Sequence, residues 1–159
     1  VAPVSRLEIM IGKTLGGATV AAFQGLLVFV LTLFVGFRPY NLLMLPVAAL
    51  FIFLVAILFT SLGIAVASKL EDMQGFQLIM NFLVMPIFFL SGALFPLEGL
   101  PKAMEIITNL DPLTYGIDGL RLSLINVGKF GLATDLVVIG SITAVLLGIG
   151  SYFFERIQA

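Results

Sequence analysis

Charged residues divide this sequence into four long stretches that carry no charge at all. A helix rises about 1.5 Å per residue and the hydrocarbon core of a bilayer is about 30 Å thick, so roughly 20 apolar residues can cross it. Because lipid cannot hydrogen-bond an exposed backbone, each stretch must be helical. The uncharged stretches hold 24, 30, 25 and 19 residues: Thr14–Phe37, Pro39–Ser68, Met73–Leu97 and Leu136–Phe154. The sequence therefore predicts an all-α integral membrane protein with four spans, over residues 14–37, 43–67, 73–95 and 136–154.

The composition excludes several classes of function. Of 159 residues, 60% are hydrophobic and 11% are charged, against about 25% charged in soluble domains, and the mean hydropathy is +1.19. There is no cysteine and no histidine, which excludes disulfides and thiolate metal sites and removes the usual general base. A net charge of −1 gives no electrostatic basis for binding nucleic acid. We expect a lipid-embedded chain with no metal site and no catalytic residue.

The third connection, residues 96–135, differs from the two short polar turns before it. Its 40 residues hold two half-polar segments, 100–110 and 115–126, on either side of Pro112. Segments of this kind lie on a membrane face or dip into it. With four crossings, both termini share one side of the membrane, and each side carries four cations. The positive-inside rule only weakly favours the terminal side as cytoplasmic.

The first thirteen residues predict a short amphipathic helix at the membrane surface. Ser5 can cap this helix, and Glu8 three residues later completes a capping box. Leu7, Met10 and Ile11 then fall on one face of the helix. The segment is either offered to a partner protein or is the plain start of the first span.

Three residues of the third span are candidates for lining a path through the membrane: Gln77, Asn81 and Pro86. Polar groups in spans usually face the bundle or a water-filled cavity rather than lipid. A proline frees a backbone carbonyl and kinks its helix. An interhelical hydrogen bond and a purely architectural kink are the alternatives for these positions.

The polar residues give little support to an enzyme. Gly12-Lys13-Thr14 resembles the end of a phosphate-binding loop, but the required earlier glycine is replaced by Leu7, and no strand precedes it. Acidic residues of the 96–135 connection lack a nucleophile–base arrangement. Asp118 and Arg121 are three residues apart on one helical face, so we expect them to pair and fix the second short helix.

Two segments carry a family resemblance. FLSGALFPLEGLP at residues 89–101 and NLDPLTYGIDGLR at 109–121 closely resemble the signature of type-2 permeases of ATP-binding-cassette (ABC) transporters, in the drug-resistance and polyketide-antibiotic exporter branch. The opening APVSRLEIMIGK also looks like the family's segment before its third span. Asp111 interrupts the usual Asn-Pro pair, which weakens any role for Asn109. The resemblance implies a six-span subunit, of which this chain holds spans three to six, cut from a longer protein.

The resemblance also implies roles for particular residues. Residues 1–13 would form the cytoplasmic coupling helix that receives the motion of a separate ATPase subunit, and residues 96–135 would hold re-entrant helices on the outer face. The coupling residues would be Pro3, Ser5, Arg6 and Glu8. The residues shaping the outer gate would be Phe95, Pro96, Pro101, Pro112, Tyr115, Asp118 and Arg121.

The implied assembly is a transporter in the cytoplasmic membrane of a prokaryote. Two permease copies, identical or homologous, would pair with two ATPase subunits, which would hold the ATP and the magnesium, while this chain binds no cofactor. The implied cargo is a hydrophobic drug-like or lipid-like molecule, because 15 of the 18 aromatic residues are Phe and none is Trp, and sugar-stacking surfaces favour Trp and Tyr. Export of a polysaccharide or glycolipid and a non-transport membrane scaffold are the alternatives.

Overall fold

A computed structural model describes residues 6–70, 72–95, 97 and 99–156, and of residues 6, 7 and 151–156 it describes the backbone alone. Over this part of the chain the structure contains helices and no strand. One short 3₁₀ turn, η1 (Leu42–Met44), precedes the second long helix. The α-helices are α1 (Arg6–Phe34), α2 (Leu45–Ala67), α3 (Met73–Leu90), α4 (Lys102–Leu110), α5 (Pro112–Ile125) and α6 (Leu132–Arg156).

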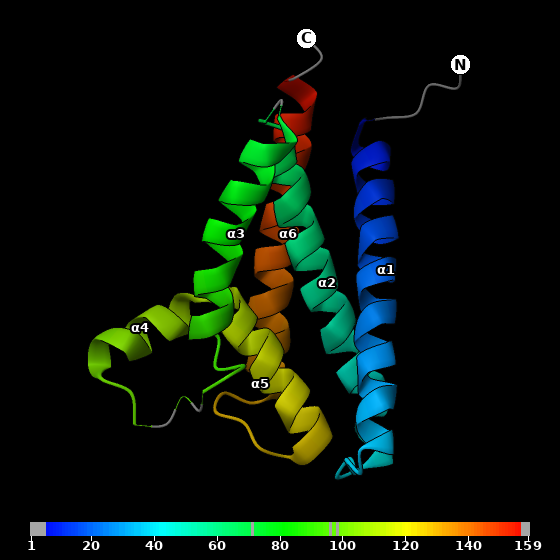
Figure 1. Cartoon of the computed structure of the whole chain (residues 1–159), viewed down its shortest axis with the longest axis vertical. Helices are drawn as coiled ribbons and strands as arrows, with labels where there is room; N and C mark the ends of the chain where they lie inside the picture. The colour runs from blue at the N-terminus through cyan, green and yellow to red at the C-terminus, as the bar shows by residue number, and fades with distance from the viewer. Residues whose placement is uncertain (1–5, 71, 96, 98, 157–159) are drawn as a thin grey trace.

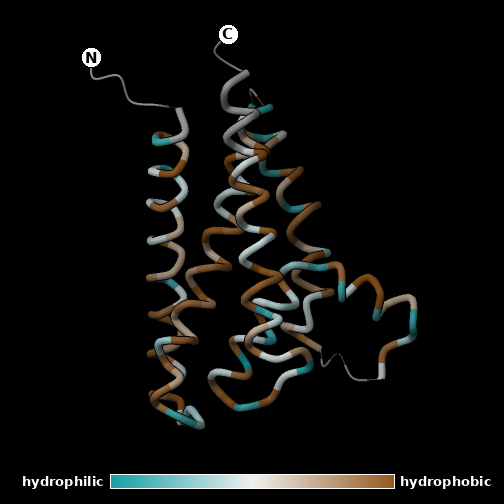
Figure 2. The backbone as a smooth tube through the Cα atoms, turned by 180° about the vertical axis from the view of Figure 1, so that it is seen from behind, coloured by the Kyte–Doolittle hydropathy of each residue, from teal (hydrophilic) through white to brown (hydrophobic). Residues whose placement is uncertain are grey.

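Four of these helices, α1, α2, α3 and α6, are long and apolar enough to cross a membrane. They confirm the all-α membrane fold with four spans. The third helix ends at Leu90, five residues before the predicted boundary, because Ser91 and Gly92 turn the chain there. The last helix begins at Leu132, four residues before its predicted start. Figure 2 shows hydrophobic residues along the long helices and hydrophilic residues in the turns at their ends.

The N-terminal segment differs from the expected separate surface helix. The helix α1 is continuous from Arg6 to Phe34, so residues 6–13 form its first turns and no break separates them from the span. Neither a proline nor a capping turn interrupts the sequence there, and adding residues to an existing helix is favourable once it is nucleated. Pro3 and Ser5 lie outside the described residues. Their coupling role, and that of Arg6 and Glu8, stays a prediction.

The bundle core is formed by α1, α2, α5 and α6. One face of α1 is buried at Met10, Thr14 and Ala18, which follow one another at four-residue spacing and therefore lie on one side of a helix. Phe51 and Leu58 of α2 and Ile139 of α6 form the buried cluster at the centre. Small residues let helices approach one another closely in lipid, where burying apolar side chains gives no driving force for helix association.

The helices α3 and α4 lie at the margin of this core. No described residue of α3 is buried, whereas α2 has five buried residues. Figures 1 and 2 show α3 close to α2 at the end where the two are connected and diverging from it toward the other end. The helix α4 runs inward from the side of the bundle, and α5 returns from their junction along α2 and α6 (Figure 1). These two short helices lie where the sequence predicts two half-polar segments, and their re-entrant placement in the membrane stays a prediction.

The bundle has two ends that differ in the connections they hold. The terminal end holds the start of α1 and the finish of α6, together with the turn between α2 and α3 (Figure 1). The loop end holds the connection from α1 to α2 and the connection from α5 to α6 (Figure 1). At the loop end the backbone N–H of Tyr40 donates to the carbonyl of Leu124 at 2.7 Å, which ties the first connection to α5.

Candidate functional site

The helix α5 begins with a cap at Asp111, the residue that interrupts the usual Asn-Pro pair. The Asp111 carboxylate accepts a hydrogen bond from the backbone N–H of Leu113 at 2.9 Å, and Pro112 occupies the first helical position. Aspartate before a proline is a favourable helix start, because the proline lacks the N–H that would otherwise need a partner. Burial raises the pKa of Asp111 from 3.8 to about 6, although the bond from Leu113 works in the opposite direction. In the sequence, the Asp111-Pro112 pair is the feature that could have predicted this helix start.

Tyr115, one of the expected gate residues, connects three segments. Its hydroxyl donates to the backbone carbonyl of Asn109 near the end of α4, at 2.7 Å. Its ring lies against Phe130 in the α5–α6 connection, with ring centroids 4.8 Å apart. The bond uses the main chain of Asn109, so it does not require that residue's side chain. Tyr115 thereby holds the α4–α5 junction and the segment before α6 to one another.

Asp118 is buried and fixes the connection into α6. Its carboxylate accepts hydrogen bonds from the backbone N–H groups of Lys129, at 2.8 and 2.9 Å, and of Phe130, at 2.9 Å. The expected pairing of Asp118 with Arg121 is wrong, because each side chain finds its partner elsewhere among the described residues. A loop that returns to the helix offers unpaired N–H groups to the carboxylate, and helical spacing alone cannot reveal this.

Arg121 reaches in the other direction, to the end of α3. Its guanidinium donates to the backbone carbonyl of Gly92 at 2.7 Å, across 29 residues of sequence. Gly92 has a φ of +78°, a conformation that favours glycine, and it follows the fully buried Ser91. Arg121 therefore contacts the SG pair of the motif at residues 89–101, a partner that the sequence analysis did not assign to it.

An ion pair adds a weaker connection at the surface of this region. The Lys129 ammonium lies 2.9 Å from the Glu105 carboxylate of α4 and 5.2 Å from the centroid of the Phe130 ring. Both side chains are well exposed, so the pair is screened by water and contributes little to stability. Glu105 and Lys129 line, together with Asp118 and Arg121, a cavity of about 450 Å³ that also borders Leu97 and Gly128.

Asp135 is one of the acidic residues of the 96–135 connection. The structure places it in the first turn of α6, fully buried, and neither of its carboxylate oxygens has a hydrogen-bond partner in the described part of the chain. Asp118 is the neighbouring acid that acts on it electrostatically. Nothing in the sequence distinguished Asp135 from the exposed acids. No group of three or more acidic side chains among the described residues is arranged to hold a metal ion.

The other predicted site residues do not converge. Phe95 is 63% exposed, Pro101 caps the start of α4, and Pro96 lies outside the described residues. Glu8 is exposed in the first turn of α1, far from this region at the terminal end (Figure 1). The three path-lining candidates of α3 are all exposed on the chain: Gln77, Asn81 and Pro86. None of the three lines the cavities described for this part of the chain.

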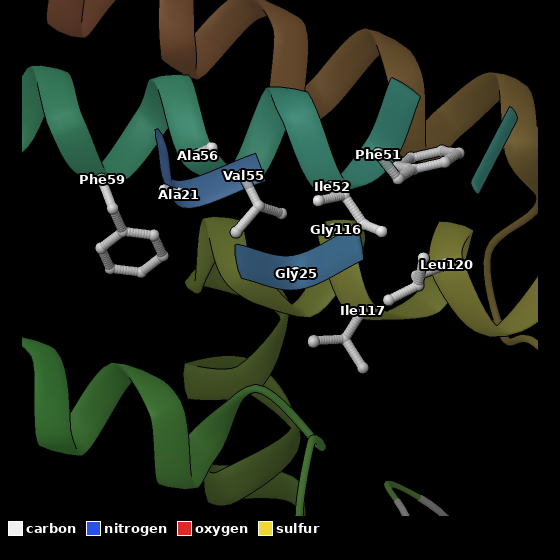
Figure 3. A pocket seen from close by; sticks show the side chains of 10 residues that line it. All are labelled: Ala21, Gly25, Phe51, Ile52, Val55, Ala56, Phe59, Gly116, Ile117 and Leu120. Carbon is white, nitrogen blue, oxygen red and sulfur yellow. The ribbon is translucent and has the colours of Figure 1, made fainter. Parts of the chain in front are cut away.

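The apolar cavity shown in Figure 3 lies between α1, α2 and α5 and measures about 340 Å³. Gly25 of α1 forms one side, and a Cβ there would lie 2.9 Å from a methyl group of Ile52. Phe59 and Val55 of α2 face it together with Ile117 of α5 (Figure 3). A second apolar cavity of about 300 Å³ shares Ile52 and extends toward Leu124.

Comparison with known proteins decides the family. The model of the ABC-2 type transporter family matches residues 1–125, which include α1 to α5 and the side chains of Tyr115, Asp118 and Arg121. The chain belongs to the ABC-2 type transporter family. The resemblance of the 89–101 and 109–121 motifs to ABC-2 permeases is thereby confirmed, and their drug-resistance branch stays a prediction.

Relatives of this ABC-2 chain come from bacteria and from an alga. It is 29% identical over 139 residues to the inner membrane transport permease YadH of Escherichia coli K12, covering 87% of this chain and 54% of the relative. It is 31% identical to nodulation protein J of Rhizobium meliloti, over 72% of this chain and 43% of that protein. It is 31% identical to the putative transport permease ycf38 of Pyropia yezoensis, over 74% and 40%.

This ABC-2 chain spans about half the length of the curated relatives that it matches. No solved structure matched it. Its four apolar helices and its similarity to an inner membrane permease identify it as a multi-pass protein of the cytoplasmic membrane.

Proposed function

We propose that this chain is the transmembrane part of an ABC-2 exporter, which moves a hydrophobic drug-like or lipid-like molecule out across the cytoplasmic membrane. A separate nucleotide-binding subunit hydrolyses the ATP and holds its magnesium. The observation that carries the proposal is the family match over residues 1–125 in a chain with four membrane-spanning helices. The terminal end would face the cytoplasm and the loop end would face outward.

The continuous helix α1 supports a coupling role for the residues at its start. Its 29 residues extend about 43 Å at 1.5 Å per residue, enough to cross the bilayer and project beyond it. A force applied by an ATPase at residues 6–8 would be transmitted along one rigid element, without a flexible joint before the span. The coupling residues remain those expected from the sequence, Pro3, Ser5, Arg6 and Glu8.

The helix α3 supports pairing with a second permease copy or a homologous permease. It presents the polar residues Gln77 and Asn81 on one helical face, and both are exposed in the isolated chain. Polar groups in spans rarely face lipid and usually find a partner. A second permease placed against this face would provide hydrogen-bond partners for Gln77 and Asn81. Both residues would then line the path between the two permeases.

The proposed cargo is inferred from the side chains that line the apolar cavity between α1, α2 and α5. The cavity of Figure 3 is lined by aliphatic side chains and phenylalanine, which favour an apolar molecule over a sugar.

Replacing Ala21 with Phe would fill this cavity from α1. The matched control is Val20→Phe on the next position, which is exposed and does not line it. With the transporter in proteoliposomes, we expect Ala21→Phe to reduce ATPase stimulation by apolar compounds and Val20→Phe to leave it unchanged. Stimulation by lipid-linked sugars alone would favour the polysaccharide or glycolipid alternative.

The test of the transporter proposal uses the complete subunit, co-expressed with an ATPase encoded beside it. The double swap Arg6→Glu with Glu8→Arg reverses the charges at the start of α1. The matched control is Glu105→Lys with Lys129→Glu, which reverses an ion pair in the loop region. We expect the ATPase to co-purify with the parent and with the control, and less with the first swap. Absence of any ATPase in every lipid and nucleotide condition would favour the membrane scaffold.

A further inference from the structure

The far end of α3 is held to the rest of the chain by very little. The helix has no buried described residue, and it diverges from α2 after their shared turn (Figures 1 and 2). Beside its final residues, near Leu90 and Met104, an apolar cavity of about 180 Å³ separates it from α4. The long-range bond at this end is the one from Arg121 to the carbonyl of Gly92.

The two partners of that bond are fixed in different ways. On the α5 side, Arg121 follows Asp118 by one turn, and Gly119 between them packs directly beneath the Phe51 ring of α2. This places Arg121 on a helix that the core holds rigidly. A guanidinium donating to a carbonyl is a charge-assisted bond, stronger than one between neutral groups.

On the α3 side, the acceptor carbonyl is presented by a defined turn. The Ser91 hydroxyl donates to the carbonyl of Phe88 at 2.8 Å and accepts from the N–H of Ala93 at 3.3 Å. Gly92 adopts a φ of +78°, and a Cβ at this position would lie 2.7 Å from Cγ of Leu97. The turn therefore requires glycine and holds its carbonyl toward α5, so the bond joins a rigid core helix to the end of a marginal one.

We propose that Arg121 is a positioning residue whose bond to Gly92 holds α3 against α5, and that breaking this bond lets the end of α3 move away from the core. The movement is assigned to a transport cycle on the basis of the proposed function. A single bond suits such a contact, because it can be exchanged for water without rebuilding an apolar interface. Within the described chain α3 buries no residue, whereas α1 and α2 do, so breaking the bond can release α3 without opening the core.

The test measures the distance from α3 to α6 by double electron–electron resonance in the complete subunit, in lipid. This chain has no cysteine, so spin labels at Met85→Cys and Val137→Cys have no background within it, and any cysteine elsewhere in the subunit is replaced first. A second pair, Val28→Cys with Leu50→Cys, reports on α1 and α2. All four labelled positions are exposed. The perturbation is Arg121→Met, which keeps an unbranched stem and removes the donor, and Arg121→Leu, which also lacks a donor, serves if that variant does not fold.

We expect Arg121→Met to move the α3–α6 distances to longer values and to leave the α1–α2 distances unchanged. Lys129→Met is the matched control, because it removes another cation of the same region whose ion pair does not involve α3. It is expected to change neither pair. An unchanged α3–α6 distribution in Arg121→Met overturns the proposal. So does broadening of both pairs, which would mean that Arg121 supports the whole fold rather than the position of α3.

The transport assignment has its own readout. In the complex with its ATPase, a non-hydrolysable nucleotide should move the α3–α6 distances of the parent in the direction that Arg121→Met produces. No movement with nucleotide would overturn the role in the cycle. The distances without nucleotide need no ATPase, so they can support the bond between α5 and α3 even if the exporter proposal fails. Co-purification of an ATPase together with unchanged distances in Arg121→Met would support the exporter proposal and overturn the role of the Arg121 bond.

Discussion

The helices α3 and α5 reverse the usual relation between apolar sequence and interior position. The helix α3 is long and apolar enough to span a membrane, yet none of its described residues is buried. The helix α5 has only 14 residues, carries Asp118 and Arg121, and has six buried residues. In lipid, apolar side chains are satisfied at the surface, so the interior goes to small residues that pack closely and to polar groups that find partners. Gly116, Gly119 and Asp118 are the residues of α5 that meet these conditions.

The largest expected effect is from adding volume beneath α5. A Cβ at Gly119 would overlap the Phe51 ring, so Gly119→Val should destabilise the fold by about 3 kcal/mol and lower the yield of folded protein. The control is Gly140→Val in α6, where a Cβ would meet nothing within 4 Å. Thermal unfolding in detergent measures both. Equal melting temperatures for the two variants would mean that α5 is not part of the core.

A smaller effect is expected from removing the carboxylate that holds the α5–α6 connection. Asp118→Ala leaves the N–H groups of Lys129 and Phe130 without their acceptor and should cost about 2 kcal/mol. Asp118→Asn keeps one acceptor oxygen and should cost less. Hydrogen exchange of residues 126–131, followed by mass spectrometry, locates the effect. Protection that persists in Asp118→Ala would show that other contacts hold this connection.

The start of α5 should depend on pH. Its buried Asp111 has a pKa of about 6 against 3.8 ordinarily, so the folded state binds the proton more tightly than the unfolded state. The resulting stabilisation is complete below pH 3.8 and is lost as the pH rises through 6. Asp111→Asn keeps the capping oxygen and removes the titration, so its stability relative to the parent should be greater at pH 8 than at pH 5.

Asp111→Ala is the control for the cap itself. It also removes the titration, and because it lacks the capping oxygen it should be about 1 kcal/mol less stable than Asp111→Asn at both pH values. Melting curves of the parent and both variants at pH 5 and pH 8 separate the two effects. A pH-independent difference between Asp111→Asn and the parent would contradict the raised pKa.

The smallest expected effect lies on α3. Phe82 is 83% exposed, so Phe82→Ala should change the unfolding free energy of the isolated subunit by no more than about 0.5 kcal/mol. Its effect should be seen instead in the association of two permeases, measured by cross-linking in membranes. A large loss of stability in the monomeric subunit would show that α3 belongs to the core after all and would remove the contrast with α5.

The expected site was only partly recoverable from the sequence. The motif at 109–121 led to Tyr115, Asp118 and Arg121, and the structure places all three in one region. Their partners were not predicted, because they are main-chain groups: the carbonyls of Asn109 and Gly92 and the N–H groups of Lys129 and Phe130. Every residue carries such groups, so the sequence cannot indicate which of them is used.

The four spans and the membrane environment could be predicted from the amino-acid sequence, because hydrocarbon allows only helices of a certain length and excludes charge. The continuity of α1 from Arg6, the place of α5 in the core and the place of α3 at its margin could be seen only in the packed chain. Hydropathy cannot separate these cases, since lipid and protein interior are equally apolar. Close packing separates them, and it depends on which surfaces meet: Gly119 beneath Phe51, and Arg121 within reach of Gly92.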